Sequence, residues 1–117
     1  EGNSPIAIDY IPPFGDNLGY TSLELMLLSL SSCVATALLV LLRRQGKKVK
    51  SLSIKSMALD PNHPTSFEEI QLNISIKSLD LTDDELEKSI EMIKGVCPVY
   101  FMIKESTRIV FNHVISN

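Results

Sequence analysis

The sequence predicts an α+β domain organised around one long apolar helix. Three observations indicate this fold class. A nearly uncharged apolar stretch runs from Leu23 to Leu42, with Glu24 as its one charged residue. Apolar and polar residues alternate in several other segments, as in strands that bury one face, and one further segment has the amphipathic pattern of a surface helix. Because 117 residues suffice for one core, we expect a single domain over residues 1–117.

The apolar stretch is too long for a buried strand, so we expect a helix there. Thr21 or Ser22 can cap its start, and Gly46 can close its end after Arg43 and Arg44. A helix that is apolar on all sides either crosses a membrane or forms the core of a protein. Several small polar residues argue against a membrane span, namely Ser29, Ser31, Ser32, Cys33 and Thr36. We therefore expect a core helix, covered in part by a second subunit.

The remaining elements are predicted from alternation, capping and turn residues. We expect strands over residues 5–10, 49–59 (with a bulge), 67–77 and 108–115, a helix over residues 82–95, and a short helix that begins at Pro98. Thr82 and Glu85 have the spacing of a capping box. Cys97 would occupy the N-cap of the short helix, because proline is favoured as the first helical residue.

Composition excludes several function classes. The net charge of −3 and the pI of about 5.3 predict no general attraction to nucleic acid or to anionic membranes. No secretory signal is visible, so we expect a cytoplasmic protein, in which two cysteines serve catalysis or metal binding more often than structure. His63 and His113 are expected at the surface or at a sheet edge. Since no spacing typical of a zinc site occurs, we expect neither a metal nor another cofactor.

The two cysteines are the strongest candidates for chemistry. Cys33 lies inside the apolar helix, where a cysteine is more often a small hydrophobic residue than a reactive one. A thiol at a helix N-terminus, such as Cys97, faces unpaired backbone N–H groups, which favour the thiolate and lower its pKa. The two positions are 64 residues apart, and the spacing alone does not bring them together.

The segments SLELMLLSLSSC, ending at Cys33, and CPVY, starting at Cys97, resemble the family of osmotically induced protein C and organic hydroperoxide resistance proteins (OsmC/Ohr). The loop PPFGDN and the segment DLTDDEL extend this resemblance over nearly the whole chain. The resemblance implies an OsmC-like fold, in which a long central buried helix is flanked by antiparallel sheet. It also implies an intertwined homodimer, with the family's N-terminal hairpin shortened in this chain.

The resemblance further implies thiol chemistry on organic hydroperoxides. Cys33 matches the peroxidatic cysteine and Cys97 the resolving cysteine, with a lipoyl-type dithiol as the reductant. The peroxidase branch also has an upstream arginine and a glutamate ten residues before the first cysteine. In this chain no arginine precedes Arg43, and Leu23 takes the place of that glutamate.

The next residue, Glu24, is a possible supporting group. It lies nine residues before Cys33, about half a turn away from it around a straight helix, and it more simply stabilises the helix N-terminus. Tyr20 and Tyr100 flank the two cysteine segments, and they could line an apolar pocket or pack in the core.

Three functions follow from this reading. The first is thiol-dependent reduction of organic hydroperoxides in oxidative-stress defence. The second is non-enzymatic binding of an apolar small molecule in the dimer cleft. The third is a disulfide that only sets the stability of the dimer.

Overall fold

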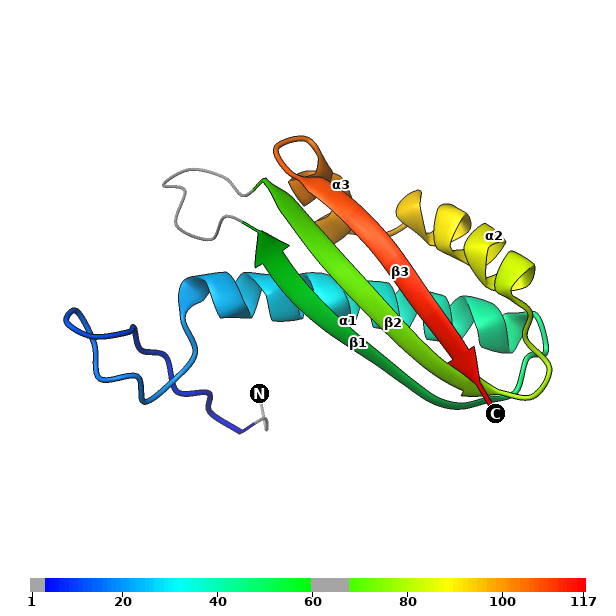
Figure 1. The fold of residues 1–117 in the computed structure, drawn as a ribbon, viewed down its shortest axis with the longest axis horizontal. Coiled ribbons are helices and arrows are strands. Elements are labelled where there is room, and N and C mark those ends of the chain that lie inside the picture. The colour runs from blue at the N-terminus through cyan, green and yellow to red at the C-terminus, as the bar shows by residue number, and fades with distance from the viewer. Residues whose placement is uncertain (1–3, 60–67) are drawn as a thin grey trace.

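The structure is a computed structural model that describes residues 4–59 and 68–117 (Figure 1). In chain order its elements are α1 (Ser22–Arg44), β1 (Val49–Leu59), β2 (Glu69–Ser78), α2 (Asp83–Lys94), α3 (Pro98–Lys104) and β3 (Arg108–Ser116). Helices and strands therefore occur in one mixed unit, and the predicted α+β class is confirmed.

The three strands form one sheet in the order β1-β2-β3. β1 and β2 are antiparallel, with a register irregularity between Val49 and Ser51 that confirms the predicted bulge. β2 and β3 are parallel, so the expectation of an antiparallel sheet was wrong for this pair of strands. The reason is the connection between them: α2 and α3 carry the chain back across the sheet, which allows β3 to run in the same direction as β2 (Figure 1).

The N-terminal segment also differs from the prediction. The strand predicted over residues 5–10 is absent, and Ile8 makes only an isolated bridge with Tyr20. The alternating residues have no neighbouring strand to pair with among the described residues, and the segment extends away from the domain (Figure 1). It consequently exposes many large apolar side chains, those of Ile6, Ile8, Tyr10, Ile11, Phe14, Leu18 and Tyr20.

Local capping sets where the two longer helices begin. In α1 the Thr21 side chain accepts from the Glu24 backbone N–H, and the Glu24 carboxylate accepts from the Thr21 N–H at 2.9 Å. Thr82 and Glu85 make the same reciprocal pair at the start of α2, as predicted. After α1 the chain reverses through Gly46, whose φ of +78° is a conformation that favours glycine.

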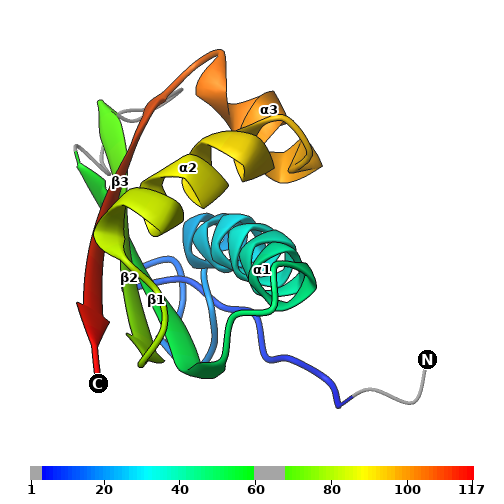
Figure 2. The same ribbon diagram turned by 90° about the vertical axis from the view of Figure 1, so that its right-hand side faces the viewer.

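All three helices lie on one face of the sheet (Figure 2). α1 contributes one buried stripe to the core, made of Leu30, Val34, Leu38 and Leu42. The central strand β2 supplies the facing layer, in which Ile70, Leu72, Ile74 and Ile76 are almost completely buried. Leu86, Ile90 and Ile93 of α2 close the core beside β3.

The rest of α1 is not covered within the single chain. α1 is long and apolar enough to cross a membrane, and 33% of its most apolar stretch is buried. The core helix of a soluble protein passes the same test, so length and composition do not decide between the two. Leu28 remains 49% exposed on the outer side of the helix, and Val40, on the side toward the end of α2, is 45% exposed.

The core on β2 predicts a large difference between two leucines. Leu72→Ala is expected to lower the free energy of unfolding by about 2–5 kcal/mol, because it leaves a cavity in a fully buried layer. Leu79→Ala is the matched control, since Leu79 is 70% exposed just after β2 and its change is expected to stay within about 0.5 kcal/mol. Urea unfolding measures both, and equal losses would contradict this packing.

Candidate functional site

The structure brings Cys33 and Cys97 into direct contact. Their Sγ atoms are 2.7 Å apart, with the Cys97 thiol donating to the Cys33 sulfur, and both are free thiols. Cys97 is buried, with 2% of its surface exposed, whereas Cys33 is only partly buried. A small side-chain movement would bring the two sulfurs to the S–S bond length of about 2.05 Å. The pair can therefore exchange between two thiols and one disulfide.

Helix ends place Cys97 over α1. Gly95 ends α2, and the Cys97 backbone N–H donates to the carbonyl oxygen of Ile93 at 3.0 Å, which keeps the chain tight between the two helices. Cys97 is the N-cap of α3 and Pro98 is at its first turn, as predicted. α3 packs on α1, so the cap faces the middle of the long helix, where Cys33 lies.

The surroundings of Cys97 favour the protonated thiol. Burial raises its pKa from an ordinary value of 9.0 to about 11, and the hydrogen bond to Cys33 acts in the same direction. The backbone N–H groups of Tyr100 and Val99 oppose this shift but are weaker. The expectation that the helix N-terminus lowers the pKa of Cys97 was therefore wrong, because desolvation outweighs the helix end.

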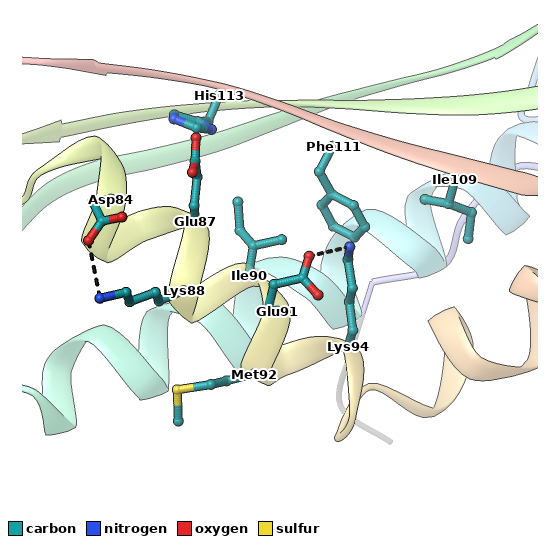
Figure 3. Close-up of a pocket in the computed structure, with 10 residues that line it drawn as sticks. All are labelled: Asp84, Glu87, Lys88, Ile90, Glu91, Met92, Lys94, Ile109, Phe111 and His113. Carbon is teal, nitrogen blue, oxygen red and sulfur yellow. Dashed lines mark hydrogen bonds and ion pairs between the residues drawn. The ribbon is translucent and has the colours of Figure 1, made fainter.

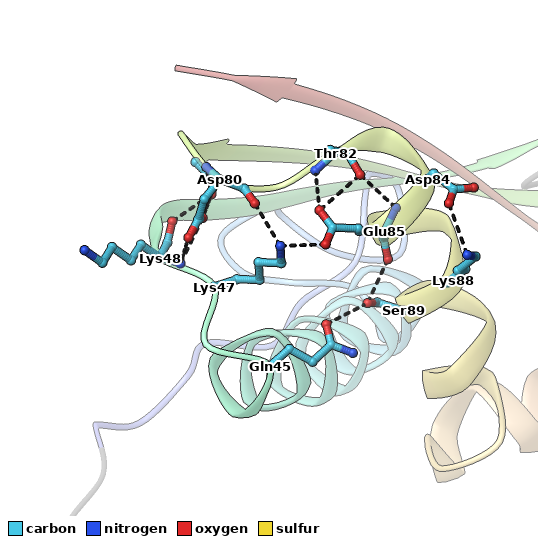
Figure 4. A network of polar contacts seen from close by, with 10 residues as sticks. Gln45, Lys47, Lys48, Asp80, Thr82, Asp84, Glu85, Lys88 and Ser89 are labelled. Carbon is cyan, nitrogen blue, oxygen red and sulfur yellow. Dashed lines mark hydrogen bonds and ion pairs between the residues drawn. The ribbon is translucent and has the colours of Figure 1, made fainter.

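A polar network fixes α2 relative to the end of α1 (Figure 4). The Lys47 ammonium contacts a Glu85 carboxylate oxygen at 2.6 Å and donates to the Asp80 carbonyl oxygen at 2.9 Å. The Lys48 backbone N–H donates to the Asp80 carboxylate, and this bond, before the others, lowers the pKa of Asp80. The hydrogen bond from Lys47 likewise lowers the pKa of Glu85. The network joins the two segments that flank the β1-β2 hairpin, and so holds α2 in the position that delivers Cys97.

The other predicted site residues lie apart from the thiols or touch them only through backbone. Glu24 is exposed and engaged in the α1 capping box. Tyr20 is 46% exposed beside Ile8, in the N-terminal segment. Tyr100 is half-buried, with its ring 5.7 Å from that of Phe111, and its backbone N–H faces the Cys97 sulfur.

His113 does not join the thiols. His113 lies on β3, an edge strand, with its Nε2 3.1 Å from an Asp83 carboxylate oxygen. His63 lies outside the described residues. Within residues 4–59 and 68–117, no three histidine, cysteine or carboxylate side chains gather as metal ligands would.

An apolar groove that was not predicted lies between α1 and the end of α2, about one helical turn from Cys33. Its volume is about 370 Å³. Thr36 and Ala37, one turn after Cys33, line one end of it, and Val96, next to Cys97, lines the α2 side. The α1 half could have been found from helical spacing alone, by following residues three and four positions apart from Cys33. The α2 half could not, because it depends on tertiary packing.

A larger cavity of about 690 Å³ lies elsewhere, between α2 and β3 (Figure 3). Ile90, Ile109 and Phe111 form its apolar floor, and charged residues of α2 surround it. Lys94 lies 5.1 Å from the centre of the Phe111 ring and also pairs with Glu91 at 2.8 Å. No cysteine lines this cavity or the apolar groove. Cys97 itself lines a further hollow of about 380 Å³, together with Val96, Pro98 and Phe101.

The raised pKa of Cys97 predicts a loss of stability in alkaline solution. Its contribution is fully present below about pH 9 and is lost as the pH rises through about 11, because the unfolded chain releases this proton first. Relative to Cys97→Ala, the reduced wild-type protein should lose up to about 3 kcal/mol of unfolding free energy over this range. Urea unfolding at several pH values measures the difference, and parallel profiles for the two proteins would contradict the burial effect.

Comparison with solved structures gives the same fold at low sequence identity. An OsmC-like protein from Mycoplasma pneumoniae superposes with a TM-score of 0.82 at 19% identity, over 96% of this chain and 82% of that one. A protein from Aquifex aeolicus VF5 gives 0.77 at 23% identity, over 94% and 79%. The organic hydroperoxide resistance protein OsmC from Legionella pneumophila gives 0.64 at 16% identity, over 88% and 74%. No curated protein matches the sequence.

The sequence also matches a family model over most of its length. The model describes OsmC-like proteins, and the match covers residues 15–112. This range includes α1, β1, β2, both later helices, the first part of β3 and both cysteines. The chain belongs to the OsmC-like protein family.

Proposed function

We propose that this protein reduces organic hydroperoxides with its two thiols, in defence against oxidative stress in the cytosol. The observation that carries the proposal is the 2.7 Å contact between two free thiols of unequal exposure. Membership of the OsmC-like family agrees with it, since structural neighbours include an organic hydroperoxide resistance protein. Cys33 is the attacking residue in this proposal because it is the more accessible of the two.

In the first step the Cys33 thiolate attacks the distal oxygen of a hydroperoxide, ROOH. The O–O bond breaks, an S–O bond forms, and the alkoxide takes a proton from solvent and leaves as ROH. Cys33 is oxidised to the sulfenic acid, while the peroxide is reduced by two electrons. The Cys97 S–H points at the Cys33 sulfur, so a thiolate there would have a hydrogen-bond donor.

In the second step the Cys97 sulfur attacks the sulfenic acid of Cys33. The S–S bond forms, the S–O bond breaks, and hydroxide leaves with the Cys97 proton as water. An external dithiol, which we propose to be of the lipoyl type, then reduces the disulfide by exchange through a mixed disulfide. One cycle converts ROOH and the dithiol into ROH, water and the oxidised dithiol.

The assisting groups of the peroxidase branch have no counterpart near Cys33 in the described residues. The three arginines of the chain are Arg43, Arg44 and Arg108. The first two lie at the far end of α1, and Arg108 begins β3, where it faces Glu69. In the proposed mechanism the hydrogen bond from Cys97 supplies part of the stabilisation that the assisting groups of the peroxidase branch give to the thiolate. We therefore expect Cys33 to react more slowly with peroxide than the cysteine of proteins that have an arginine at the thiol.

A second candidate function is binding of an apolar molecule without turnover. The apolar groove of about 370 Å³ favours it, because pockets of this size and lining hold small apolar ligands. The two candidates differ in the fate of the thiols. A binding protein keeps both after exposure to peroxide, whereas a peroxidase loses both.

We also propose that the protein acts as an intertwined homodimer. The outer side of α1 and the N-terminal segment expose more large apolar residues than a monomer of this size usually leaves in water. A second copy, laid against α1 with its own N-terminal segment, would cover both surfaces at once.

The thiol mechanism predicts the outcome of a titration. Reduced wild-type protein should lose two thiols per chain within seconds of one equivalent of cumene hydroperoxide, as measured by thiol-reactive dye in denaturant. Cys33→Ser should retain its remaining thiol, because the attacking sulfur is gone. Cys97→Ser should lose one thiol and accumulate a sulfenic acid that dimedone traps. Survival of both wild-type thiols for minutes would overturn the peroxidase proposal in favour of ligand binding.

The dimer predicts a mass of twice 13.0 kDa in sedimentation equilibrium. Leu28→Glu should shift the protein to the monomer, because it puts a charge on the uncovered apolar side of α1. Leu79→Glu, on an equally apolar but isolated surface position after β2, should leave the dimer intact. A wild-type protein with the mass of one chain would contradict the proposal.

A further inference from the structure

We propose that the cavity between α2 and β3 binds an organic cation, namely an ammonium group attached to an aromatic body. This cavity is separate from the two thiols, so the inference goes beyond the proposed reduction of hydroperoxides and does not depend on it. Three observations carry it: the apolar floor of the cavity, the ion pairs around its rim, and the charge of Glu87, which has no ion-pair partner in the described part of the chain.

Two elements form the walls of this cavity, which has a volume of about 690 Å³ (Figure 3). On β3, Ile109, Phe111 and His113 are alternate residues, so their side chains share the face of the strand that lines the cavity. On α2, Ile90 lies at the base and is 4% exposed. Hollows of this size with an apolar floor and a few polar groups at the rim hold small organic molecules.

The floor favours an aromatic body. Ile109 and Phe111 are half-buried, so each still has surface that a ligand can cover, and covering it contributes free energy in proportion to the area. The ammonium group of Lys94 lies 5.1 Å from the centre of the Phe111 ring. An aromatic ligand can pack against the edge of this ring or against the two isoleucines beside it.

The charges at the rim leave one carboxylate over. Asp84 pairs with Lys88 at 3.2 Å, and Glu91 pairs with Lys94 at 2.8 Å (Figure 3). Glu87 lies between these pairs along α2, lines the same cavity, and has no ion pair in the part of the chain that the structure describes. Its negative charge is therefore available to a cationic ligand.

His113 does not take the place of such a ligand. Its Nε2 is 3.1 Å from a carboxylate oxygen of Asp83, in the first turn of α2, and its side chain is 16% exposed. Asp83 does not line the cavity, whereas Glu87 does and points from α2 toward the sheet (Figure 3). The imidazole is thus held by one carboxylate, and the other remains for the ligand.

The spacing along α2 sets the shape of the ligand. Lys94, which lies over the Phe111 ring, follows Glu87 by seven residues, or about 10 Å along the helix axis. An ammonium group at Glu87 and an aromatic ring on the floor fit this length when a short alkyl linker joins them. The ligand class is therefore an arylalkylamine. An acid of the same shape would place its carboxylate beside that of Glu87, which is unfavourable.

The test uses tryptamine, whose indole fluorescence can be followed because the chain contains no tryptophan. In a fluorescence anisotropy titration, the wild type should bind tryptamine about tenfold more tightly than indole-3-propionate, in which a carboxylate replaces the amine. Glu87→Gln should weaken the binding of tryptamine about fivefold and leave that of neutral 3-ethylindole unchanged. Equal affinities of the wild type for the amine and the acid would overturn the inference.

Glu105→Gln is the matched control. Glu105 is an exposed carboxylate at the end of α3 that does not line the cavity, and its replacement changes the net charge by the same amount. This variant should bind tryptamine as tightly as the wild type does. Equal losses in Glu87→Gln and Glu105→Gln would reveal a general effect of net charge and would refute a site at Glu87.

Nuclear magnetic resonance of the ¹⁵N-labelled protein locates the bound amine. Tryptamine should shift the amide signals of Ile109 and Phe111 and leave those of Thr36 and Val40, which line the apolar groove, in place. Shifts confined to the groove would contradict the assignment. Cys33→Ser should bind tryptamine like the wild type, so failure of the proposed peroxide reduction would leave this test intact.

Discussion

The packing of one stripe of α1 into the core that it shares with the sheet is the contact on which the rest of the structure depends. Leu38 and its neighbours in the stripe share one core with a layer of β2 side chains that is almost fully excluded from water. That contact fixes which side of an otherwise uniformly apolar helix faces the sheet. Once the helix is oriented, Cys33 is turned toward α3, the groove faces the end of α2, and the opposite side remains for another molecule.

Much of the fold could be predicted from the sequence because its signals are local. The two capping pairs, the alternation in β1 and β2 and the Cys97-Pro98 helix start are each encoded within a few residues. The parallel pairing of β3 could not be predicted this way, because it depends on how α2 and α3 return the chain. The N-terminal residues show the opposite case: their alternation suits a strand, but a strand needs a neighbour, and the described residues offer none.

In the site, as in the fold, local features could be predicted and tertiary contacts could not. Both cysteines were identifiable from the sequence, through composition, helix position and family resemblance. Their contact was implied by the family resemblance but not by the spacing, because it joins residues 64 positions apart. The pKa of Cys97 was predicted with the wrong sign, since the helix end is visible in the sequence whereas the depth of burial is not. The groove could be predicted in part. Helical spacing indicates the residues of its α1 side, whereas Met92 and Val96 join it only through tertiary packing.

The crossover between β2 and β3 has a consequence for the order in which the chain assembles. Glu69 of β2 pairs with Arg108 of β3, and the intervening chain contains α2, α3 and Cys97. Contacts between residues this distant in sequence form late in folding, because the entropy of a long loop must first be lost. A nascent or partly folded chain therefore holds its two sulfurs apart. An oxidant met during synthesis therefore finds two separate cysteines, and the contact between them forms only when α3 packs on α1.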